Sequence, residues 1–298
     1  MNDIIICPFC EGRGNERQLN VRDHLVSDED FFIVKCNSCD FVFTSPWPDA
    51  KDFSRYYLSQ EYISHTDASV SFTDKLYQAV RKVMLKKKFN FAVKHLTEPS
   101  SLRLLDYGCG TGEFLLYAKN RGVNVYGVEP NDAARNRAEK KQLNVQHQIP
   151  AITNEEDAFH LITLWHVLEH IPDVKDKLQL FYDSLKKDGL IIVAVPEYKS
   201  YDALRYKEYW AAWDVPRHVY HFEEKTIKML FESKKFKYIK KYPLVFDAFY
   251  IALLSEKIKG NQTFALINAF LVGLISNLHG TLGNFPWSSQ VYVFKKIE

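Results

Sequence analysis

The sequence predicts an α/β fold in which a mostly parallel sheet carries helices on both faces. Short apolar runs alternate with segments of helical spacing from residue 102 onward, a pattern typical of doubly wound sheets. A glycine-rich turn at 108–112 separates a run typical of a buried strand from one typical of a helix. The next apolar run ends in Glu129, 23 residues beyond Asp106, which closes the first strand. Two acidic strand ends are therefore expected beside one glycine turn.

Seven strands and four connecting helices are expected in this part of the chain. The strands are placed near 102–107, 123–128, 143–147, 159–165, 189–195, 236–246 and 290–295. The helices are placed near 112–121, 131–141, 173–187 and 223–234. Residues 247–287 separate the last two strands and are too many for a short crossover. We therefore expect a helical insertion at about 247–287.

The first 48 residues form a separate unit in this prediction. Four of the five cysteines make two C-x-x-C pairs, and these are Cys7, Cys10, Cys36 and Cys39. Such pairs in an intracellular chain favour tetrahedral zinc over disulfides, and four cysteine ligands leave no open position for catalysis. We therefore expect a structural zinc ribbon over 1–48, with a strand at 31–35 leading into the second pair. The alternative is two thiol turns without metal.

A helical lid or linker is expected over 49–98, after a proline-rich link. Tyr57 and Tyr62 are candidates to cover a bound cofactor, and packing between helices is the alternative for such aromatic residues. The densest basic cluster, Lys86 to Lys88, is expected on the solvated face of the long helix in this segment. The remaining domain spans 99–298.

The glycine turn indicates a nucleoside-cofactor site. Glycines let the backbone approach a ligand closely, and a helix start offers free N–H groups. An acidic residue at the tip of the second strand, here Glu129, is placed to accept hydrogen bonds from ribose hydroxyls. The spacing is G-x-G-x-G, and Glu113 stands where a dinucleotide fingerprint needs its third glycine.

The stretch LLDYGCGTGEFL followed by VYGVEPN resembles the first two cofactor motifs of class I S-adenosylmethionine-dependent methyltransferases of types 11, 12 and 23. The resemblance continues through 161–173 and 189–197 and covers about 50–298. It implies a Rossmann-like sheet of seven strands, mostly parallel with the last antiparallel, and S-adenosylmethionine as cofactor. The residues it implies for cofactor binding are Asp106, Gly108, Cys109, Gly110, Glu129 and Pro130. Cys109 is expected to suit the tight turn and not to act as a nucleophile.

Chemistry is expected at the carboxyl ends of the strands. The fourth strand ends in Trp165 and His166, which are expected to face the methionine end of the cofactor. The spacing from His166 to His170 also leaves a metal site open, but the sequence offers no clear third ligand.

An aromatic loop at 209–222 follows the fifth strand and resembles the D-x-P-R-H…H-F segment beside the acceptor pocket of the same family. His218 is the first candidate for a general base and His166 the second, since histidine titrates near neutral pH. Asp214 or Arg217 is expected to orient the base or hold the acceptor. The alternative is that Asp214 and Arg217 brace the loop while His221 caps the next helix.

Apolar stretches at 245–254 and 264–278 fall short of the roughly 20 residues that span a bilayer. We expect no membrane span there. A buried helix pair or an oligomer face is one interpretation, and an apolar lid or contact with a membrane surface is the other.

Composition and charge limit the function further. The formal net charge is +2 from 39 basic and 37 acidic residues, so no broad attraction to nucleic acid is expected. The N-terminus lacks the features of a signal peptide, which favours a cytoplasmic protein. We predict methyl transfer to a small-molecule acceptor through oxygen, nitrogen or carbon, the acceptor being sugar-linked or apolar. The alternatives are an NAD(P)-dependent oxidoreductase, a nucleic-acid-directed protein that uses the ribbon, and a scaffold without activity.

Overall fold

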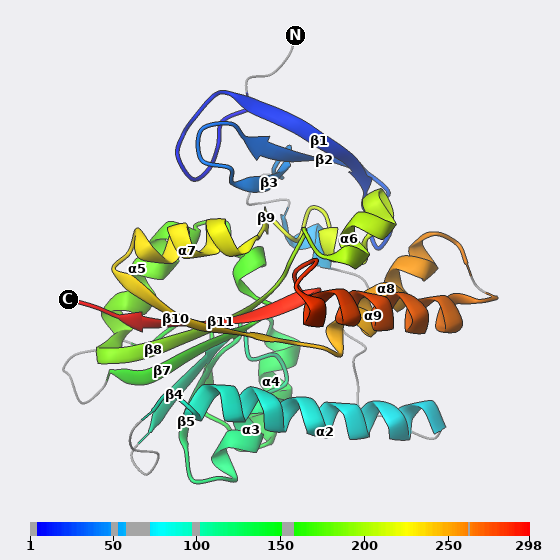
Figure 1. Cartoon of the computed structure of the whole chain (residues 1–298). Helices are drawn as coiled ribbons and strands as arrows, with labels where there is room; N and C mark the ends of the chain where they lie inside the picture. The colour runs from blue at the N-terminus through cyan, green and yellow to red at the C-terminus, as the bar shows by residue number, and fades with distance from the viewer. Residues whose placement is uncertain (1–4, 49–52, 58–71, 97–101, 151–157, 262) are drawn as a thin grey trace.

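The computed structural model describes residues 5–48, 53–57, 72–96, 102–150, 158–261 and 263–298. Within them, two sheets and the helices around them build the molecule (Figure 1). Tyr62, one of the expected cofactor residues, lies outside the described residues.

The main sheet has seven strands in the order β10-β11-β8-β7-β4-β5-β6. Its strands are β4 (Arg103–Tyr107), β5 (Asn124–Val128), β6 (Val145–Gln146), β7 (Phe159–Trp165), β8 (Leu185–Pro196), β10 (Phe236–Pro243) and β11 (Ser289–Lys296). β11 pairs antiparallel with β10 and with β8, and the other strand pairs of this sheet are parallel. The predicted fold class is confirmed, while the strand expected at 143–147 is limited to 145–146 because only those residues pair with β5.

Helices cover both faces of this sheet, as its two-sided apolar strands require. One face packs against α2 (Phe72–Val93), α3 (Glu113–Lys119) and α4 (Asp132–Lys140). The other packs against α5 (Val174–Ser184) and α7 (Glu224–Glu232). In Figure 1 these groups lie below and above the sheet respectively.

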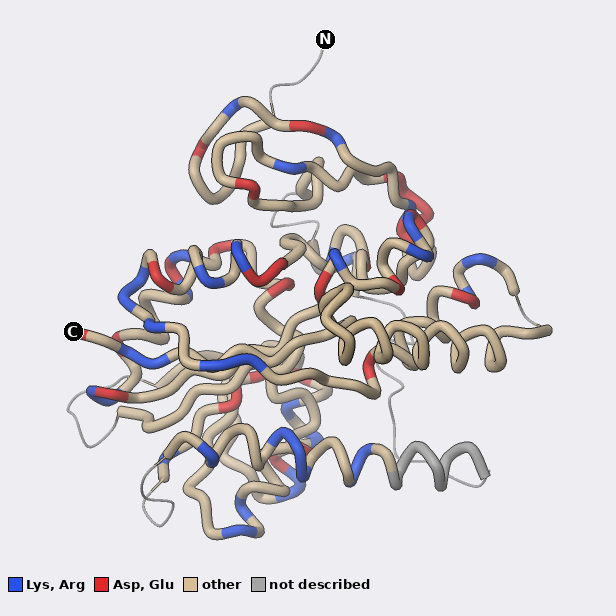
Figure 2. Tube along the Cα trace, viewed as in Figure 1, with Lys and Arg blue, Asp and Glu red and all other residues tan. Residues whose placement is uncertain are grey.

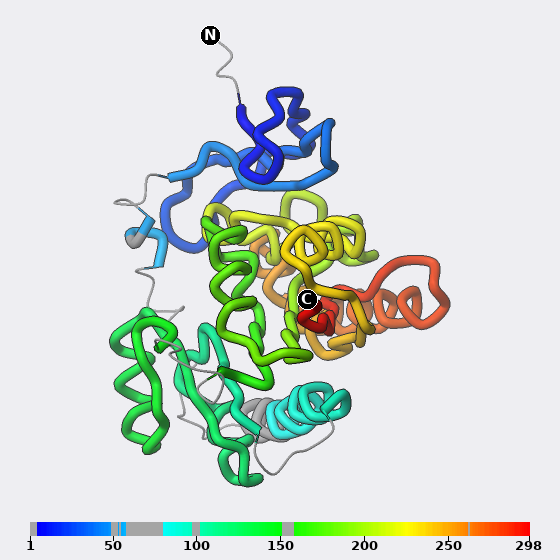
Figure 3. Tube along the Cα trace, turned by 90° about the vertical axis from the view of Figure 1, so that its left-hand side faces the viewer, coloured from blue at the N-terminus to red at the C-terminus, as the bar shows by residue number. Residues whose placement is uncertain are grey.

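The N-terminal ribbon forms the second sheet, with β1 (Asn15–Arg22), β2 (Asp30–Cys36) and β3 (Val42–Ser45) in antiparallel order. Its fourth strand is β9 (Tyr220–His221), which comes from the aromatic loop and pairs with β3. Phe41 contacts the rings of Tyr220 and Phe222 edge to face. The ribbon therefore packs directly on the α7 side of the main domain (Figure 3).

The expected insertion is a helix pair, α8 (Asp247–Ile258) and α9 (Ala265–Leu282). α9 packs against α8 through its small residues, and Gly273 lies directly against the Phe249 ring. Its outer face is apolar and exposed, and Figure 2 shows no charged residue along it. The exposed residues are Phe264, Leu266, Ile267, Phe270, Leu271, Leu274, Ile275, Leu278 and Leu282. Among the described residues, α9 is the one helix long and apolar enough to cross a membrane.

Candidate active site

The glycine loop between β4 and α3 has a backbone that other residues adopt only at a cost. Gly108, Gly110 and Gly112 have φ angles of +74°, +54° and +79°. A Cβ on Gly108 would lie 2.5 Å from Val167, and one on Gly112 would lie 2.4 Å from Leu143. A Cβ on Gly110 would meet nothing within 4 Å. The loop is therefore packed against neighbouring side chains at its ends and open at its centre, which leaves room for a ligand.

Glu129 is held against this loop at the carboxyl end of β5. The Gly110 N–H donates to its Oε2 at 2.8 Å, and the Asn131 N–H donates to its Oε1 at 2.8 Å. Burial raises the pKa of Glu129, while these two hydrogen bonds oppose the rise. The carboxylate is thereby oriented with acceptor capacity left for hydroxyl groups.

Asp106 is the penultimate residue of the neighbouring strand β4 and is buried. The Thr163 hydroxyl on β7 donates to its Oδ1 at 2.7 Å. Burial raises the pKa of Asp106 to about 7, against the lowering effects of Thr163 and the nearby Lys88 ammonium. A buried carboxylate of this kind favours a cation as its ligand.

Lys88 corrects one expectation from the sequence. Its ammonium lies 4.8 Å from the centre of the Trp165 ring instead of on a solvated helix face. Burial lowers the pKa of Lys88, although Asp247 and Asp106 act to raise it. Trp165 also meets the Phe114 ring edge to face, at 5.3 Å between centroids. The end of β7 therefore packs against α3, the helix that follows the glycine loop, and α2 contributes a lysine that was expected on a solvated face.

His166 lies between two carboxylates. Its Nε2 is 2.9 Å from Asp247 Oδ2, and its Nδ1 is 3.5 Å from Glu169 Oε1. Although burial disfavours the charge, the two carboxylates raise the pKa of His166 to about 9. A protonated imidazole has no lone pair to accept a proton, so this geometry does not suit His166 for the expected second role as base.

Arg217 and Asp214 brace the aromatic loop. The buried Arg217 guanidinium donates from Nη2 to Asp214 Oδ1 at 2.8 Å and to Asp23 Oδ1 at 2.9 Å. It also donates from Nη1 to the Tyr56 carbonyl at 3.1 Å. These contacts match the bracing alternative for this pair. His221 does not cap α7, whose N-cap is Glu223, because its Nε2 lies 3.0 Å from the Thr44 hydroxyl of the ribbon.

His218 is buried, and the half-buried His170 lies beside it. The His218 Nδ1 lies 2.8 Å from the Ala212 carbonyl, and its Nε2 lies 3.8 Å from Asp214 Oδ2. The rings of His170 and His218 meet edge to face at 4.5 Å. The Tyr57 hydroxyl lies 3.3 Å from His170 Nδ1. Tyr57 is therefore found at the histidines and not at the glycine loop.

The four ribbon cysteines converge. Cys7 Sγ lies 3.7 Å from Cys39 Sγ, and Cys10 Sγ lies 3.5 Å from Cys36 Sγ. Tetrahedral zinc with Zn–S bonds of 2.3 Å places its sulfurs about 3.8 Å apart. The separations thus fit a common metal ion and are far longer than the roughly 2.05 Å of a disulfide.

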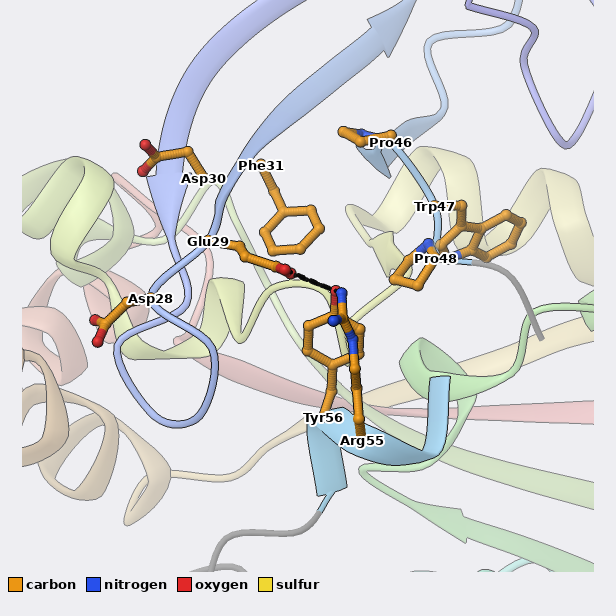
Figure 4. Close-up of a pocket in the computed structure, with 9 residues that line it drawn as sticks. All are labelled: Asp28, Glu29, Asp30, Phe31, Pro46, Trp47, Pro48, Arg55 and Tyr56. Carbon is orange, nitrogen blue, oxygen red and sulfur yellow. Dashed lines mark hydrogen bonds and ion pairs between the residues drawn. The ribbon is translucent and has the colours of Figure 1, made fainter. Parts of the chain in front are cut away.

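A pocket of 530 Å³ lies between the ribbon and residues 53–57 (Figure 4). Its lining residues are Asp28, Glu29, Asp30, Phe31, Pro46, Trp47, Pro48, Arg55 and Tyr56. In Figure 4, Arg55 and Tyr56 point toward Glu29, and Arg55 donates to Glu29 Oε1 at 2.9 Å. None of these residues belongs to the glycine loop, so the pocket is separate from the cofactor site.

The sheet order, the glycine loop and the two strand-end carboxylates define a Rossmann-like enzyme that binds a nucleoside cofactor. The chain belongs to the methyltransferase-domain family, whose model matches residues 77–241, more than half of its length. The matched segment is a methyltransferase domain.

Curated relatives cover part of the chain. It is 30% identical over 147 residues to a ubiquinone biosynthesis O-methyltransferase of Rhodopseudomonas palustris, a match that covers 46% of this chain and 58% of the relative. A protein of the same name from Coxiella burnetii is 34% identical over 91 residues, which cover 27% of this chain and 39% of the relative. The chain thus matches about half the length of these relatives or less.

Solved structures confirm the fold at low identity. The magnesium protoporphyrin IX methyltransferase of Synechocystis with bound SAH superposes with a TM-score of 0.54 at 12% identity, covering 83% of this chain and 100% of the other. The mycolic acid cyclopropane synthase CmaA1 complexed with SAH and CTAB superposes with a TM-score of 0.51 at 15% identity. This match covers 83% of this chain and 94% of the other.

Proposed function

We propose that this chain transfers the methyl group of S-adenosylmethionine to a small apolar acceptor at the carboxyl edge of its main sheet. The observation that carries the proposal is the contact between the Gly110 N–H and Glu129, which places an oriented carboxylate beside the open centre of the glycine loop. In this proposal Glu129 accepts hydrogen bonds from the ribose. Asp106 balances positive charge at the amino-acid end of the cofactor.

The curated relatives favour an oxygen acceptor. In such a reaction the acceptor hydroxyl loses its proton, its oxygen forms a bond to the methyl carbon, and the sulfonium becomes the neutral thioether of S-adenosylhomocysteine. Positioning supplies most of the rate in a direct displacement of this kind. Nitrogen and carbon acceptors need the same cofactor site.

His218 is the histidine that we propose for acceptor activation. Its Nδ1 lies at the Ala212 carbonyl, a contact that requires a protonated Nδ1 and leaves the lone pair on Nε2. That lone pair can take a proton from the acceptor directly. It can also bind a cation that makes the acceptor more acidic, and the neighbours of His218 favour this second use.

A structural zinc ion in the ribbon is also part of the proposal. Cys7, Cys10, Cys36 and Cys39 would hold it as four thiolates, which leaves no open coordination position. Because β9 belongs to the ribbon sheet, the zinc would stabilise the loop that carries His218.

We further propose that α9 lies on a membrane surface. Its outer face is apolar along the whole helix, and a patch of this kind on a monomer usually marks an interaction site. The exposed Lys257 and Lys259 stand at the adjoining end of α8, where anionic headgroups would meet them. An apolar acceptor dissolved in lipid would be accessible from this position.

Calorimetric titration with S-adenosylhomocysteine tests the cofactor site. Wild-type protein is expected to bind one equivalent, and Glu129→Ala is expected to weaken binding at least about tenfold, since a charged hydrogen bond contributes about 1.5–3 kcal/mol. Glu139→Ala, at an exposed glutamate of α4, is the matched control and should bind as wild type does. Binding of NAD in preference to S-adenosylhomocysteine would overturn the proposal.

A further inference from the structure

Glu169, His170 and His218 form a cluster beside the carboxyl end of β7, in which Glu169 and His218 are buried and His170 is half-buried. One nitrogen or oxygen of each lies within 4.8 Å of those of the other two. The sequence pairs His166 with His170 and offers no third ligand, whereas the fold brings in His218 from 48 residues further along the chain. We propose that this cluster binds a divalent transition-metal ion through two imidazoles and one carboxylate.

Glu169 is the first reason. It is 1% exposed, and neither of its carboxylate oxygens accepts a hydrogen bond from a described residue. Its nearest charged partner is the His166 imidazole, whose Nδ1 lies 3.5 Å from Oε1. This long contact offsets only part of the cost of burying the carboxylate, and a cation bound to its oxygens would offset more.

The orientation of the two histidines is the second reason. Each has Nδ1 against a backbone carbonyl, His170 at 3.1 Å from the Arg217 oxygen and His218 at 2.8 Å from the Ala212 oxygen. A carbonyl oxygen only accepts, so Nδ1 carries the proton in both rings and the lone pair lies on Nε2. Metal-bound histidines are oriented in this way, with the second ring nitrogen donating to a carbonyl or carboxylate.

Asp214 also lies beside the cluster. Its Oδ2 is 3.8 Å from His218 Nε2, while its Oδ1 is paired with the Arg217 guanidinium. A backbone hydrogen bond connects the two segments that carry the cluster, since the Val219 N–H donates to the Glu169 carbonyl at 2.7 Å. Ligand atoms at about 2.1 Å from one ion lie about 3.0–3.5 Å apart, so binding needs the side chains to close by about 1 Å.

Two imidazoles and one carboxylate are the donors found in catalytic zinc and non-haem iron sites. Three protein ligands leave coordination positions open for water or for an oxygen of the acceptor. An ion at this place would lower the pKa of an acceptor hydroxyl, whose proton would then pass to solvent water instead of to His218. That use of the ion, though not its binding, rests on the methyl transfer proposed above.

Cobalt(II) is the probe for this site, because it prefers imidazole and carboxylate while the thiolates of the ribbon keep their zinc. The full chain, with its zinc content measured, is titrated with CoCl₂ by calorimetry and by visible absorption. Wild-type protein is expected to bind one Co²⁺ without the intense thiolate bands of a cysteine site. Glu169→Gln and His218→Gln are expected to weaken Co²⁺ binding at least about a hundredfold. Loss of a residue that only hydrogen-bonds to a metal ligand already lowers metal affinity about 10–100-fold, and these variants remove the ligands themselves.

His147→Gln removes an exposed histidine away from the cluster and should bind Co²⁺ as wild type does. Affinity for S-adenosylhomocysteine and retained ribbon zinc show that each variant is folded, and they report on the cofactor site separately from the metal. Wild-type protein that binds no Co²⁺ overturns the proposal whatever the variants do. Equal binding by wild type, Glu169→Gln and His218→Gln overturns it as well.

Discussion

The Arg217 guanidinium lies 2.9 Å from the carboxylate of Asp23, and the side chains are 1% and 0% exposed. Asp23 stands in the turn after β1, and Arg217 stands 194 residues later in the loop that carries His218. This buried ion pair joins the ribbon to the candidate active site. The ribbon is thereby connected to the loop by a charge pair as well as by the strand β9.

Arg217→Met is expected to lower the free energy of unfolding by about 3–5 kcal/mol, because it leaves Asp23 buried without its counter-charge. Urea denaturation measures this. The matched control is Arg22→Met, which breaks the exposed pair between Arg22 and Asp30 and should cost at most about 1 kcal/mol. Equal losses in the two variants would contradict the buried bracing role.

Asp106 makes cofactor binding depend on pH. Burial raises its pKa to about 7, and a cationic cofactor binds the ionised carboxylate better. Binding therefore releases a proton, and affinity rises as the pH rises through this pKa. We expect S-adenosylmethionine to bind about tenfold more tightly at pH 7.5 than at pH 5.5. Asp106→Asn should bind weakly with a flatter profile, while the exposed Asp132→Asn should retain the wild-type profile. An unchanged profile in Asp106→Asn would remove this residue from cofactor binding.

Gly110 is expected to be required for the ligand more than for the fold. Alanine at its positive φ costs about 1–2 kcal/mol of stability, but no neighbouring atom blocks a Cβ there. Gly110→Ala should therefore fold and lose affinity for S-adenosylhomocysteine at least about tenfold. Gly122 also has a positive φ and open space around it, so Gly122→Ala should lose similar stability and keep its affinity. Calorimetry measures the affinity of the two variants for S-adenosylhomocysteine, and thermal denaturation measures their stability. Equal affinities of Gly110→Ala and Gly122→Ala would count against ligand approach at Gly110.

The ribbon cysteines are expected to hold zinc. Cys36→Ser should reduce the zinc content by about one equivalent and lower the melting temperature, because structural zinc contributes directly to folding. Cys109→Ser, in the glycine loop, is the matched control and should keep its zinc. Elemental analysis of purified protein decides this. Wild-type protein with less than half an equivalent of zinc would refute the ribbon assignment.

The outer face of α9 is expected to bind anionic vesicles. Phe270, Leu274 and Leu278 are 57%, 51% and 55% exposed, so their combined replacement by serine should leave the fold intact. Each large apolar side chain contributes about 1.5–3 kcal/mol when fully buried, and the triple variant should therefore lose most co-sedimentation with vesicles. Leu204→Ser, at a leucine of α6 (Tyr201–Tyr206) that is 54% exposed, is the control. If the wild-type protein does not bind vesicles but forms a dimer, and the triple variant is a monomer, this face binds a second copy of the chain instead.

The strands, helices and cofactor loop were predictable because their signals are local. The run from Leu102 to Asp106, the glycines after it and the helical spacing from Glu113 onward lie within a few residues of one another. Periodicity and turn chemistry act over that range. The two cysteine pairs are local in the same sense, and the fold brings their sulfurs together as expected.

The roles of the aromatic loop needed the tertiary structure. Its histidines and charged residues were recognised, but their partners were not. Arg217 forms an ion pair with Asp23, and His218 lies beside His170 and Glu169. The Lys88 ammonium lies over the Trp165 ring.

The sequence by itself determined the α/β fold, the cofactor loop with Asp106 and Glu129, and the four ribbon cysteines. Only the tertiary structure decided that β9 completes the ribbon sheet and that the side chains of Glu169, His170 and His218 lie together. The physical reason is that a local pattern reports how a few neighbouring residues fold. Contacts between distant residues depend on how whole elements pack, and one sequence pattern is compatible with many such partners.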